Sequence, residues 1–336
     1  MYFAGLDAHL AYVTVGIVDR GGELVTMRQV STDQPEELRT LLEAHRPIQA
    51  VVETCPFWAW IYDLLTPAGI PVQVAHAKEL RAIATSHRKT DERDALLLAR
   101  MLAAGLIPAI HPKSIAQREA ATLLRHRELC VRQRTMHANR IHAQLHRQRL
   151  HLGRERLLRK RTAEWLRTVA WPALSREQRR FIATQWRFIQ LLTQRVKPLD
   201  REIARLASHS SAAVVLQTIP GIGPYRSLLL ATELLPITRF PTPAHVVSYA
   251  GLAPSERRSA ARVVRGSIPA DANRAVRNAF VSAIPSHVRA APASSLSAYY
   301  ARLKLRVGWP VARVAAARRL ARVSYHMLKS GEVWRG

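Results

Sequence analysis

The sequence predicts an α/β domain at the N-terminus, followed by a mainly helical chain. Three observations lead to this prediction. Residues 2–74 contain short apolar runs separated by turn signals and amphipathic stretches. Residues 114–210 have few strand signals and show helical periodicity. With 336 residues, 48% of them hydrophobic, the chain can bury a core and should hold two or three domains, which excludes a disordered tail.

The N-terminal domain is expected to begin with three strands. Residues 2–6 form a short apolar run, residues 12–18 alternate between two faces, and a glycine turn at 20–23 leads to a strand at 24–30. Short turns of this kind join antiparallel strands. Helix and strand patterns then follow in the order helix 35–45, strand 49–53, helix 57–68, strand 71–74, helix 78–85 and helix 91–104. This is the element order of an RNase H-like α/β domain.

The remaining chain is predicted to hold three further segments. These are a basic helical or coiled-coil region at 114–210, a mostly helical domain at 211–296 and a basic helical tail at 297–336, after an N-terminal domain at 1–113. Within 181–207, six apolar residues follow the spacing of a coiled-coil seam: Ile189, Leu192, Val196, Leu199, Ile203 and Leu206. Pro198 should kink or end this helix. The seam serves either two core helices of one domain or self-association, and the polar intervening faces favour self-association.

The charge of the chain indicates a polyanionic partner. Its formal net charge is +27, with arginine far outnumbering lysine. Such a charge opposes compaction unless a polyanion neutralises it, and the guanidinium fork grips phosphate bidentately. Nucleic acid is the natural partner. A membrane is not expected, because no uninterrupted apolar run approaches the roughly 18 residues of a spanning helix.

Two further features bear on the compartment. Cys55 and Cys130 are too few for a disulfide framework or a thiolate zinc site. The N-terminus begins directly with a strand-like pattern, without a basic stretch and an apolar core typical of a signal peptide. A reducing, cytoplasmic location is therefore expected.

Four carboxylates are the candidate metal ligands. Asp7 ends the first predicted strand, Glu53 ends the fourth, and Asp91 and Asp94 share one face at the start of a helix. Strand ends and an adjacent helix converge on one crevice in an open α/β sheet. Oxygen ligands at such a place favour Mg²⁺ or Mn²⁺, and a pair of ions there can assist cleavage of a phosphodiester.

Two of the four acids also have a structural explanation. Asp91 could serve the helix N-terminus alone, and Asp94 could be an ordinary surface acid. Asp7 and Glu53 follow apolar runs, where a carboxylate needs a partner, so their functional interpretation is the stronger one. His9, His76 and His87 lie near these acids, but the sequence assigns them no role.

The residues around these acids resemble a known family. The motifs Gly5-Leu6-Asp7, Val51-Val52-Glu53 and Lys89-Thr90-Asp91-Glu92-Arg93-Asp94 resemble the DEDD motif of the RuvC-like insertion-sequence transposases, also described as bridge-RNA-guided recombinases. The resemblance continues at Ile219–Pro224 and at Tyr249–Pro254. In order and spacing it covers nearly the whole chain.

The resemblance implies a second half of the site. In this family a C-terminal transposase domain carries a nucleophilic serine a few residues after the Tyr-Ala-Gly-Leu-x-Pro motif, and Ser259 matches that position. Ala260 stands where glycine is usual, so Ser255 is an alternative nucleophile. The family further implies a phosphoserine–DNA intermediate, a composite site shared between the subunits of a dimer or tetramer, double-stranded DNA from the element ends and target, and a non-coding guide RNA.

Several residues are candidates for nucleic-acid binding. Gly221 and Gly223 flank Ile222 before a helix, as in a helix-hairpin-helix turn whose amides approach a phosphate, although a plain interhelical turn is an equal alternative. The basic candidates are Lys89, Arg257, Arg258, Arg262 and Arg265.

Three functions are compatible with these patterns. The first is a transposase or site-specific recombinase that cuts and rejoins DNA through Ser259 with Mg²⁺ assistance. The second is a RuvC-like junction endonuclease that uses metal-activated water and needs only the four carboxylates. The third is a non-catalytic nucleic-acid-binding protein, which the complete set of four acids disfavours.

Overall fold

The fold is described from a computed structural model of residues 1–336. The description covers residues 1–83, 90–152, 157, 162–254, 256–259, 262–266 and 272–336. The chain divides into two compact units, Met1–Pro112 and Lys113–Gly336, and each is described by itself. Within the described residues, no helix has the length and hydrophobicity needed to cross a membrane.

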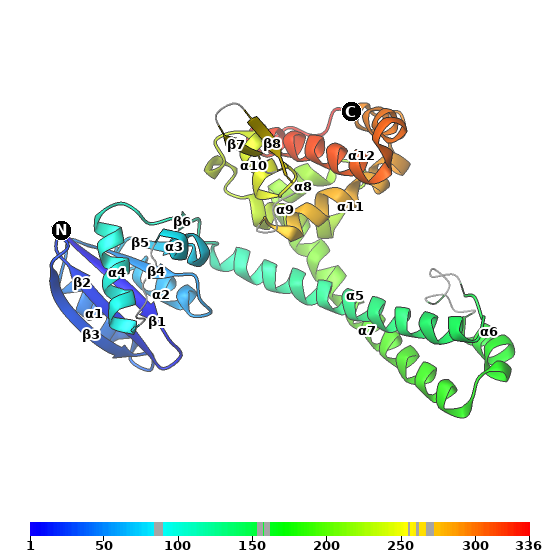
Figure 1. Ribbon diagram of the computed structural model, residues 1–336, viewed down its shortest axis with the longest axis horizontal. Coiled ribbons are helices and arrows are strands. Elements are labelled where there is room, and N and C mark those ends of the chain that lie inside the picture. Colours follow the sequence, from blue (N-terminus) through cyan, green and yellow to red (C-terminus); the bar gives the residue numbers. More distant parts are fainter. Residues whose placement is uncertain (84–89, 153–156, 158–161, 255, 260–261, 267–271) are drawn as a thin grey trace. The chain divides into compact units, whose positions relative to one another are not determined.

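The first unit is built on a six-stranded mixed sheet (Figure 1). Its strands lie in the order β3-β2-β1-β4-β5-β6. Their bounds are Tyr2–Ala8 (β1), Tyr12–Val18 (β2), Leu24–Ser31 (β3), Ile48–Glu53 (β4), Val72–Ala75 (β5) and Ala109–Ile110 (β6). The first three strands pair antiparallel, β4 and β5 run parallel to β1, and β6 is antiparallel. This is the RNase H-like order that the sequence predicts; the two-residue strand β6 was not foreseen.

Helices cover both faces of this sheet. Their bounds are Pro35–Glu43 (α1), Trp58–Leu65 (α2), Ala77–Ile83 (α3) and Asp91–Ala103 (α4). Alternate strand residues such as Leu6, Val15 and Val52 form one core with α1 and α2. Phe3 and Val51 point the other way and pack with α4. The alternation expected for Tyr12–Val18 is therefore present, with both faces buried.

In its described residues, the second unit consists of helices and one hairpin. Its helices are Ile115–Arg147 (α5), Thr162–Trp165 (α6), Leu166–Ala170 (η2, a π-helical turn), Trp171–Ala173 (η3), Arg176–His209 (α7), Ser211–Gln217 (α8), Pro224–Leu234 (α9), Ile237–Arg239 (η4), Pro243–Tyr249 (α10), Arg274–Ala290 (α11) and Ser295–Ser330 (α12). The hairpin consists of strands Glu256–Ser259 (β7) and Arg262–Arg265 (β8).

The long helices α5 and α7 lie side by side, with α6 near their far end (Figure 1). Each begins with a capping box, at Ser114 and at Ser175. Ile189, Val196 and Ile203 of the predicted seam are buried. Much of the seam thus packs within one chain, which was the alternative to self-association. The expected end at Pro198 is not seen, because the buried residues on both sides of it hold the helix against α5.

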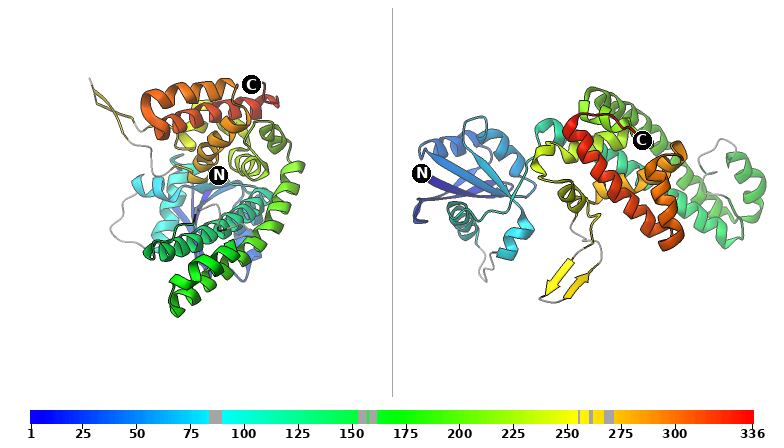
Figure 2. Two further views of the ribbon diagram at one scale, coloured as in Figure 1. Left: turned by 90° about the vertical axis from the view of Figure 1, so that its right-hand side faces the viewer. Right: turned by 90° about the horizontal axis from the view of Figure 1, so that it is seen from above.

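The last helix is integrated into the helical core. Ala316, Leu320, Ala321 and Tyr325 of α12 are buried in one cluster with residues of α8 to α11. The segment expected as a basic tail therefore contributes to the core over its second half. Its first half is separated by Gly308, whose φ of +77° interrupts the helix. Figure 2 shows α12, coloured orange to red, alongside the other helices of this unit. The β7–β8 hairpin, coloured yellow, lies outside the group of helices.

Candidate functional site

Two of the four candidate acids lie side by side at the ends of neighbouring strands. Strands β1 and β4 are parallel, and Leu6 pairs with Val52. Asp7 and Glu53 follow these two residues and therefore occupy equivalent places on adjacent strands. Both are on the face that α4 covers, because they alternate with Leu6 and Val52 of the opposite core. The convergence that the strand pattern predicts is present.

Glycines bring helix α4 directly onto these strands. Gly5 pairs with Gly16 across β1 and β2. A Cβ atom on Gly5 would stand 2.0 Å from the carbonyl oxygen of Ala95, and one on Gly16 would stand 3.1 Å from the amide nitrogen of Leu96. The helix backbone thus rests on the glycine pair. Because of this close approach, the N-terminus of α4 lies near the end of β1.

Helix α4 starts at the residue that the sequence indicates. Thr90 is its N-cap, and the Thr90 hydroxyl accepts a hydrogen bond from the amide of Arg93. Capping is therefore the task of Thr90, which leaves the carboxylate of Asp91 available for other contacts.

Asp91, Asp7, His9 and Tyr12 form a connected polar cluster. His9 Nε2 is 3.0 Å from Asp7 Oδ2 and 3.4 Å from Asp91 Oδ1. The Tyr12 hydroxyl donates to Asp91 Oδ2 at 2.9 Å. One ligand atom from each of Asp7, His9 and Asp91 can be chosen so that all three lie within 4.8 Å of one another. The cluster thus joins the ends of β1, β2 and α4.

The other two acids are electrostatic neighbours of this cluster. Burial is the largest cause of the raised pKa of Asp7, and the negative charges of Asp91 and Asp94 add to the rise. Burial is likewise the largest cause of the raised pKa of the Cys55 thiol, with the charges of Glu53 and Asp7 adding to it. Glu53 and Asp94 are both partly buried and engaged in contacts of their own. The four acids therefore surround one region of the first unit.

The surroundings of Asp7 disfavour the charged form of its carboxylate. Burial is the largest cause that raises its pKa, and only the contact with His9 opposes it. A cation beside Asp7 would relieve both the burial penalty and the repulsion. The carboxylates fit a divalent ion, because carboxylate oxygens suit Mg²⁺ or Mn²⁺.

Two members of the cluster were not identified from the sequence. The sequence assigns no role to His9 and indicates Tyr12 only as a strand residue. A lone histidine two positions after an acid carries little information. The register that places Tyr12 opposite α4 depends on packing, so the sequence offers only the alternation of β2 as a signal.

The second predicted half of the site lies on the β7–β8 hairpin. Ser259 is the last residue of β7 and pairs with Arg262, and Arg258 pairs with Val263. The region was expected to be mostly helical, and the hairpin was not foreseen. Ser255, Ala260 and Lys89 lie outside the described residues.

The Gly221–Gly223 turn connects α8 to α9. Gly221 has a φ of +89°, and a Cβ atom there would stand 2.5 Å from the amide nitrogen of His287 on α11. Gly221 is thus required by packing within the unit. Gly223 is the N-cap of α9, and among the described residues none but its chain neighbours can come within 4 Å of the place where its Cβ would be.

Fold and cluster together define an RNase H-like protein with an acidic site of the kind found in DEDD enzymes. Two family models match the chain: a DEDD transposase model over residues 4–148, and a model of the IS116/IS110/IS902 transposase family over residues 213–301. The chain therefore belongs to the IS110 family of transposases, a family of DNA-cutting and DNA-rejoining enzymes.

Two curated relatives are similar to the chain. A Sinorhizobium fredii protein named as transposase y4pF/y4sB is 25% identical over 305 residues, which are 89% of this chain and 77% of the relative. A 43.6 kDa protein of insertion element IS110 from Streptomyces coelicolor is 31% identical over 136 residues, or 40% of this chain and 33% of the relative.

One solved structure also aligns with the chain. The RuvC structure of Thermus thermophilus matches at 19% identity with a TM-score of 0.25, over 33% of this chain and all of that one. The RNase H-like assignment rests on the strand order and not on this match.

Proposed function

We propose that this chain is a transposase that cuts and rejoins the DNA of an insertion sequence through a phosphoserine intermediate on Ser259, assisted by Mg²⁺ or Mn²⁺. The observation that carries the proposal is the Asp7–His9–Asp91 cluster, with Glu53 and Asp94 around it. A partly buried carboxylate with a raised pKa, beside further acids, is the arrangement expected where a cation is bound.

Asp7, Glu53, Asp91 and Asp94 would hold the ion, and Tyr12 and His9 would orient the carboxylates. When bound, the ion would supply charge stabilisation at the scissile phosphate. Tyr12 keeps Asp91 in place with its hydroxyl hydrogen, and His9 lies between Asp7 and Asp91. Such outer contacts fix the ligand geometry on which metal affinity depends.

Ser259 would be the nucleophile, with arginines around it to bind phosphate. Ser259 pairs with Arg262 in the register of the hairpin, and Arg257 and Arg258 precede it on the same strand. Guanidinium groups so near in the chain and across the hairpin would neutralise the charge of the attacked phosphodiester.

The reaction exchanges one phosphoester for another. The Ser259 oxygen forms a bond to phosphorus, the phosphorus–oxygen bond to one DNA segment breaks, and the leaving DNA oxygen ends as a hydroxyl that has gained the proton lost by serine. Attack of a DNA hydroxyl on the phosphoserine reverses these changes and rejoins a strand. Because each step conserves a phosphoester bond, no external energy source is required.

The α5 surface supports binding of a nucleic-acid backbone, including the guide RNA that the family implies. Arg125, Arg132, Arg140 and Arg147 are exposed and follow one another at intervals of seven or eight residues. This spacing places them along one side of the helix. A row of guanidinium groups suits the phosphates of RNA or of double-stranded DNA.

A homo-oligomer, dimeric or tetrameric, would complete the site. In the proposed arrangement the acidic cluster of one subunit works on DNA that is attached to Ser259 of another. Leu192 and Leu199 of the seam on α7 are only partly buried. Their exposed apolar surface would contribute to association between subunits.

The test compares variants on element-end DNA with Mg²⁺ and a candidate RNA. Ser259→Ala and Asp7→Ala should both abolish a covalent protein–DNA adduct that survives denaturation. Ser248→Ala, at an exposed serine of α10, is the matched control and should form the adduct normally.

Two results would redirect the proposal. Loss of the adduct in Ser255→Ala, with Ser259→Ala unaffected, would move the nucleophile. Normal cleavage by Ser259→Ala without any adduct would contradict the phosphoserine mechanism and favour a metal-activated water.

A further inference from the structure

The segment that carries Ser259 leaves and rejoins the helical core at a single point. Tyr249 ends α10, and Asn273 caps α11 by accepting hydrogen bonds from the amides of Ala275 and Val276 at 3.1 Å. The backbone amide of Asn273 donates to the carbonyl of Tyr249 at 2.9 Å. The two ends of the segment 250–272, here called the serine segment, are thus bonded to each other.

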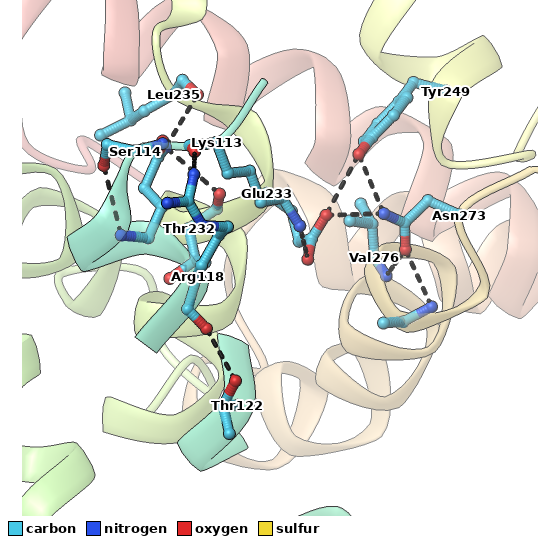
Figure 3. Close-up of polar contacts among 12 residues, drawn as sticks. Lys113, Ser114, Arg118, Thr122, Thr232, Glu233, Leu235, Tyr249, Asn273 and Val276 are labelled. Carbon is cyan, nitrogen blue, oxygen red and sulfur yellow. Dashed lines mark hydrogen bonds and ion pairs between the residues drawn. The ribbon is translucent and has the colours of Figure 1, made fainter. Parts of the chain in front are cut away.

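The side chains of the same two residues converge on Glu233 (Figure 3). The Tyr249 hydroxyl donates to Glu233 Oε2 at 3.1 Å, and the Asn273 amide donates to the same oxygen at 2.8 Å. The Asn273 amide also donates to the Tyr249 hydroxyl oxygen at 3.0 Å. One carboxylate oxygen therefore accepts hydrogen bonds from both residues that flank the serine segment.

The second oxygen of Glu233 bonds to the start of the unit. Lys113 Nζ is 2.5 Å from Glu233 Oε1, and Lys113 is the first residue after the N-terminal unit ends at Pro112. Gln117, one turn further along α5, donates to the carbonyl of Leu235 at 3.0 Å. The place where the chain enters the second unit is therefore attached to the end of α9, next to Glu233.

Helix stability does not explain this acid. Glu233 lies in the last turn of α9, where a negative charge opposes the helix dipole, and its side chain is only 12% exposed. A carboxylate buried to this degree is costly unless its oxygens are paired. Here both are paired, and Arg239 adds positive charge nearby, 5.0 Å from the Tyr249 ring centre.

We propose that Glu233 is a positioning residue for the Ser259 hairpin, and that it fixes both ends of the serine segment to the point where the chain arrives from the DEDD unit. This inference rests on the proposed role of Ser259. The Glu233 carboxylate holds the two residues that flank the serine segment at one place, so loosening it slows attack by Ser259 without weakening DNA binding.

The test uses the full-length protein and three variants. Tyr249→Phe removes one donor to Glu233 and keeps the ring. Asn273→Asp keeps an N-cap for α11 but replaces the amide donor with a second carboxylate. Lys113→Met removes the cation from the other oxygen. Tyr325→Phe is the control, because its hydroxyl bonds to the carbonyl of Phe240 in the same core.

Two measurements are made on each variant. Hydrogen exchange at the amides of Gly251, Leu252 and Asn273 reports on the ends of the serine segment without any chemistry by Ser259. Adduct formation at saturating DNA is measured beside the dissociation constant for DNA. For the three variants we expect at least tenfold faster exchange and about tenfold slower adduct formation, with DNA affinity within twofold of wild type and of Tyr325→Phe.

The outcomes separate this inference from the proposed function. Wild-type exchange in Tyr249→Phe and Asn273→Asp, or wild-type adduct formation despite faster exchange, would overturn the positioning role. Wild-type exchange in Lys113→Met would overturn the connection to the start of the unit. If Ser259→Ala still forms the adduct, the proposed function fails, while the exchange data still decide whether Glu233 fixes the segment.

Discussion

The Tyr12 hydroxyl donates a 2.9 Å hydrogen bond to Oδ2 of Asp91, although the two residues are 79 positions apart in the sequence. The carboxylate of Asp91 and its negative charge raise the pKa of the Tyr12 phenol, so the hydroxyl remains a donor. The contact joins strand β2 to the first residue of α4 beside Asp7.

Tyr12→Phe should therefore weaken metal binding. Loss of an outer contact of this kind typically lowers metal affinity or activity about 10- to 100-fold. Titration with Mn²⁺, followed by electron paramagnetic resonance, measures the affinity directly. Tyr2→Phe, at the opposite end of the same sheet, is the control and should bind Mn²⁺ like wild type. Equal affinity in all three proteins would remove Tyr12 from the site.

Asp7→Asn should stabilise the metal-free protein at neutral pH. The raised pKa means that the folded state holds the Asp7 proton more tightly than the unfolded state does. The wild-type fold consequently loses stability as the pH rises from the ordinary value of 3.8 through the raised pKa, and the penalty persists above it. Thermal unfolding from pH 3 to 8 should show an advantage of the variant at pH 7 that shrinks at acid pH.

The effect of metal should have the opposite sign. Mg²⁺ should raise the melting temperature of the wild-type protein at pH 7 and have a smaller effect on Asp7→Asn, because a ligand that binds only the folded state stabilises it. A variant that is less stable than wild type without metal at pH 7 would contradict the explanation from charge repulsion.

Gly5→Ala should displace α4 and thereby move Asp91 and Asp94, which lie at the start of this helix, away from Asp7. The added methyl group would overlap the carbonyl of Ala95, which is backbone and cannot turn aside. We expect a loss of about 3 kcal/mol in the free energy of unfolding, at the upper end of the range for overpacked cores. Gly21→Ala, in the β2–β3 turn, is the control and should cost far less. Urea unfolding of both variants measures the difference.

Removal of charges from α5 should weaken nucleic-acid binding uniformly across sequences. Arg132→Gln and Arg140→Gln should each reduce the slope of log K against log salt by about one, if each contacts one phosphate. Arg205→Gln is the control, because this arginine is exposed on α7 and paired with Glu202 at 2.6 Å. Slopes equal to wild type in both α5 variants would exclude this side of α5 as the binding surface.

The sequence predicts the N-terminal unit more completely than the second one. Asp7 and Glu53 are predictable because strand alternation and an apolar run determine both the face and the strand end. The place of Asp91 is predictable because the helical pattern begins at this residue, whereas the N-cap role of Thr90 is seen only in the structure. These signals are local, so no knowledge of the packing is needed.

The remaining features depend on contacts between distant residues. The hairpin at Glu256–Arg265 was missed because its arginine-rich strands lack an apolar face, and the burial of α12 was missed because its alanines pack on other helices. Lys113, Tyr249 and Asn273 all contact Glu233, although Lys113 and Asn273 are 160 positions apart. Contacts over such a separation produce no periodic pattern in the sequence.

The central claim is that a serine, and not water, attacks the DNA. Cleavage of element-end DNA with Mg²⁺ in water enriched in ¹⁸O, followed by mass spectrometry of the products and of the digested protein, tests it most directly. We expect a peptide whose Ser259 carries a DNA phosphate, and rejoined strands without ¹⁸O. Cleaved strands that carry one ¹⁸O in their terminal phosphate, with Ser259 unmodified, would contradict it.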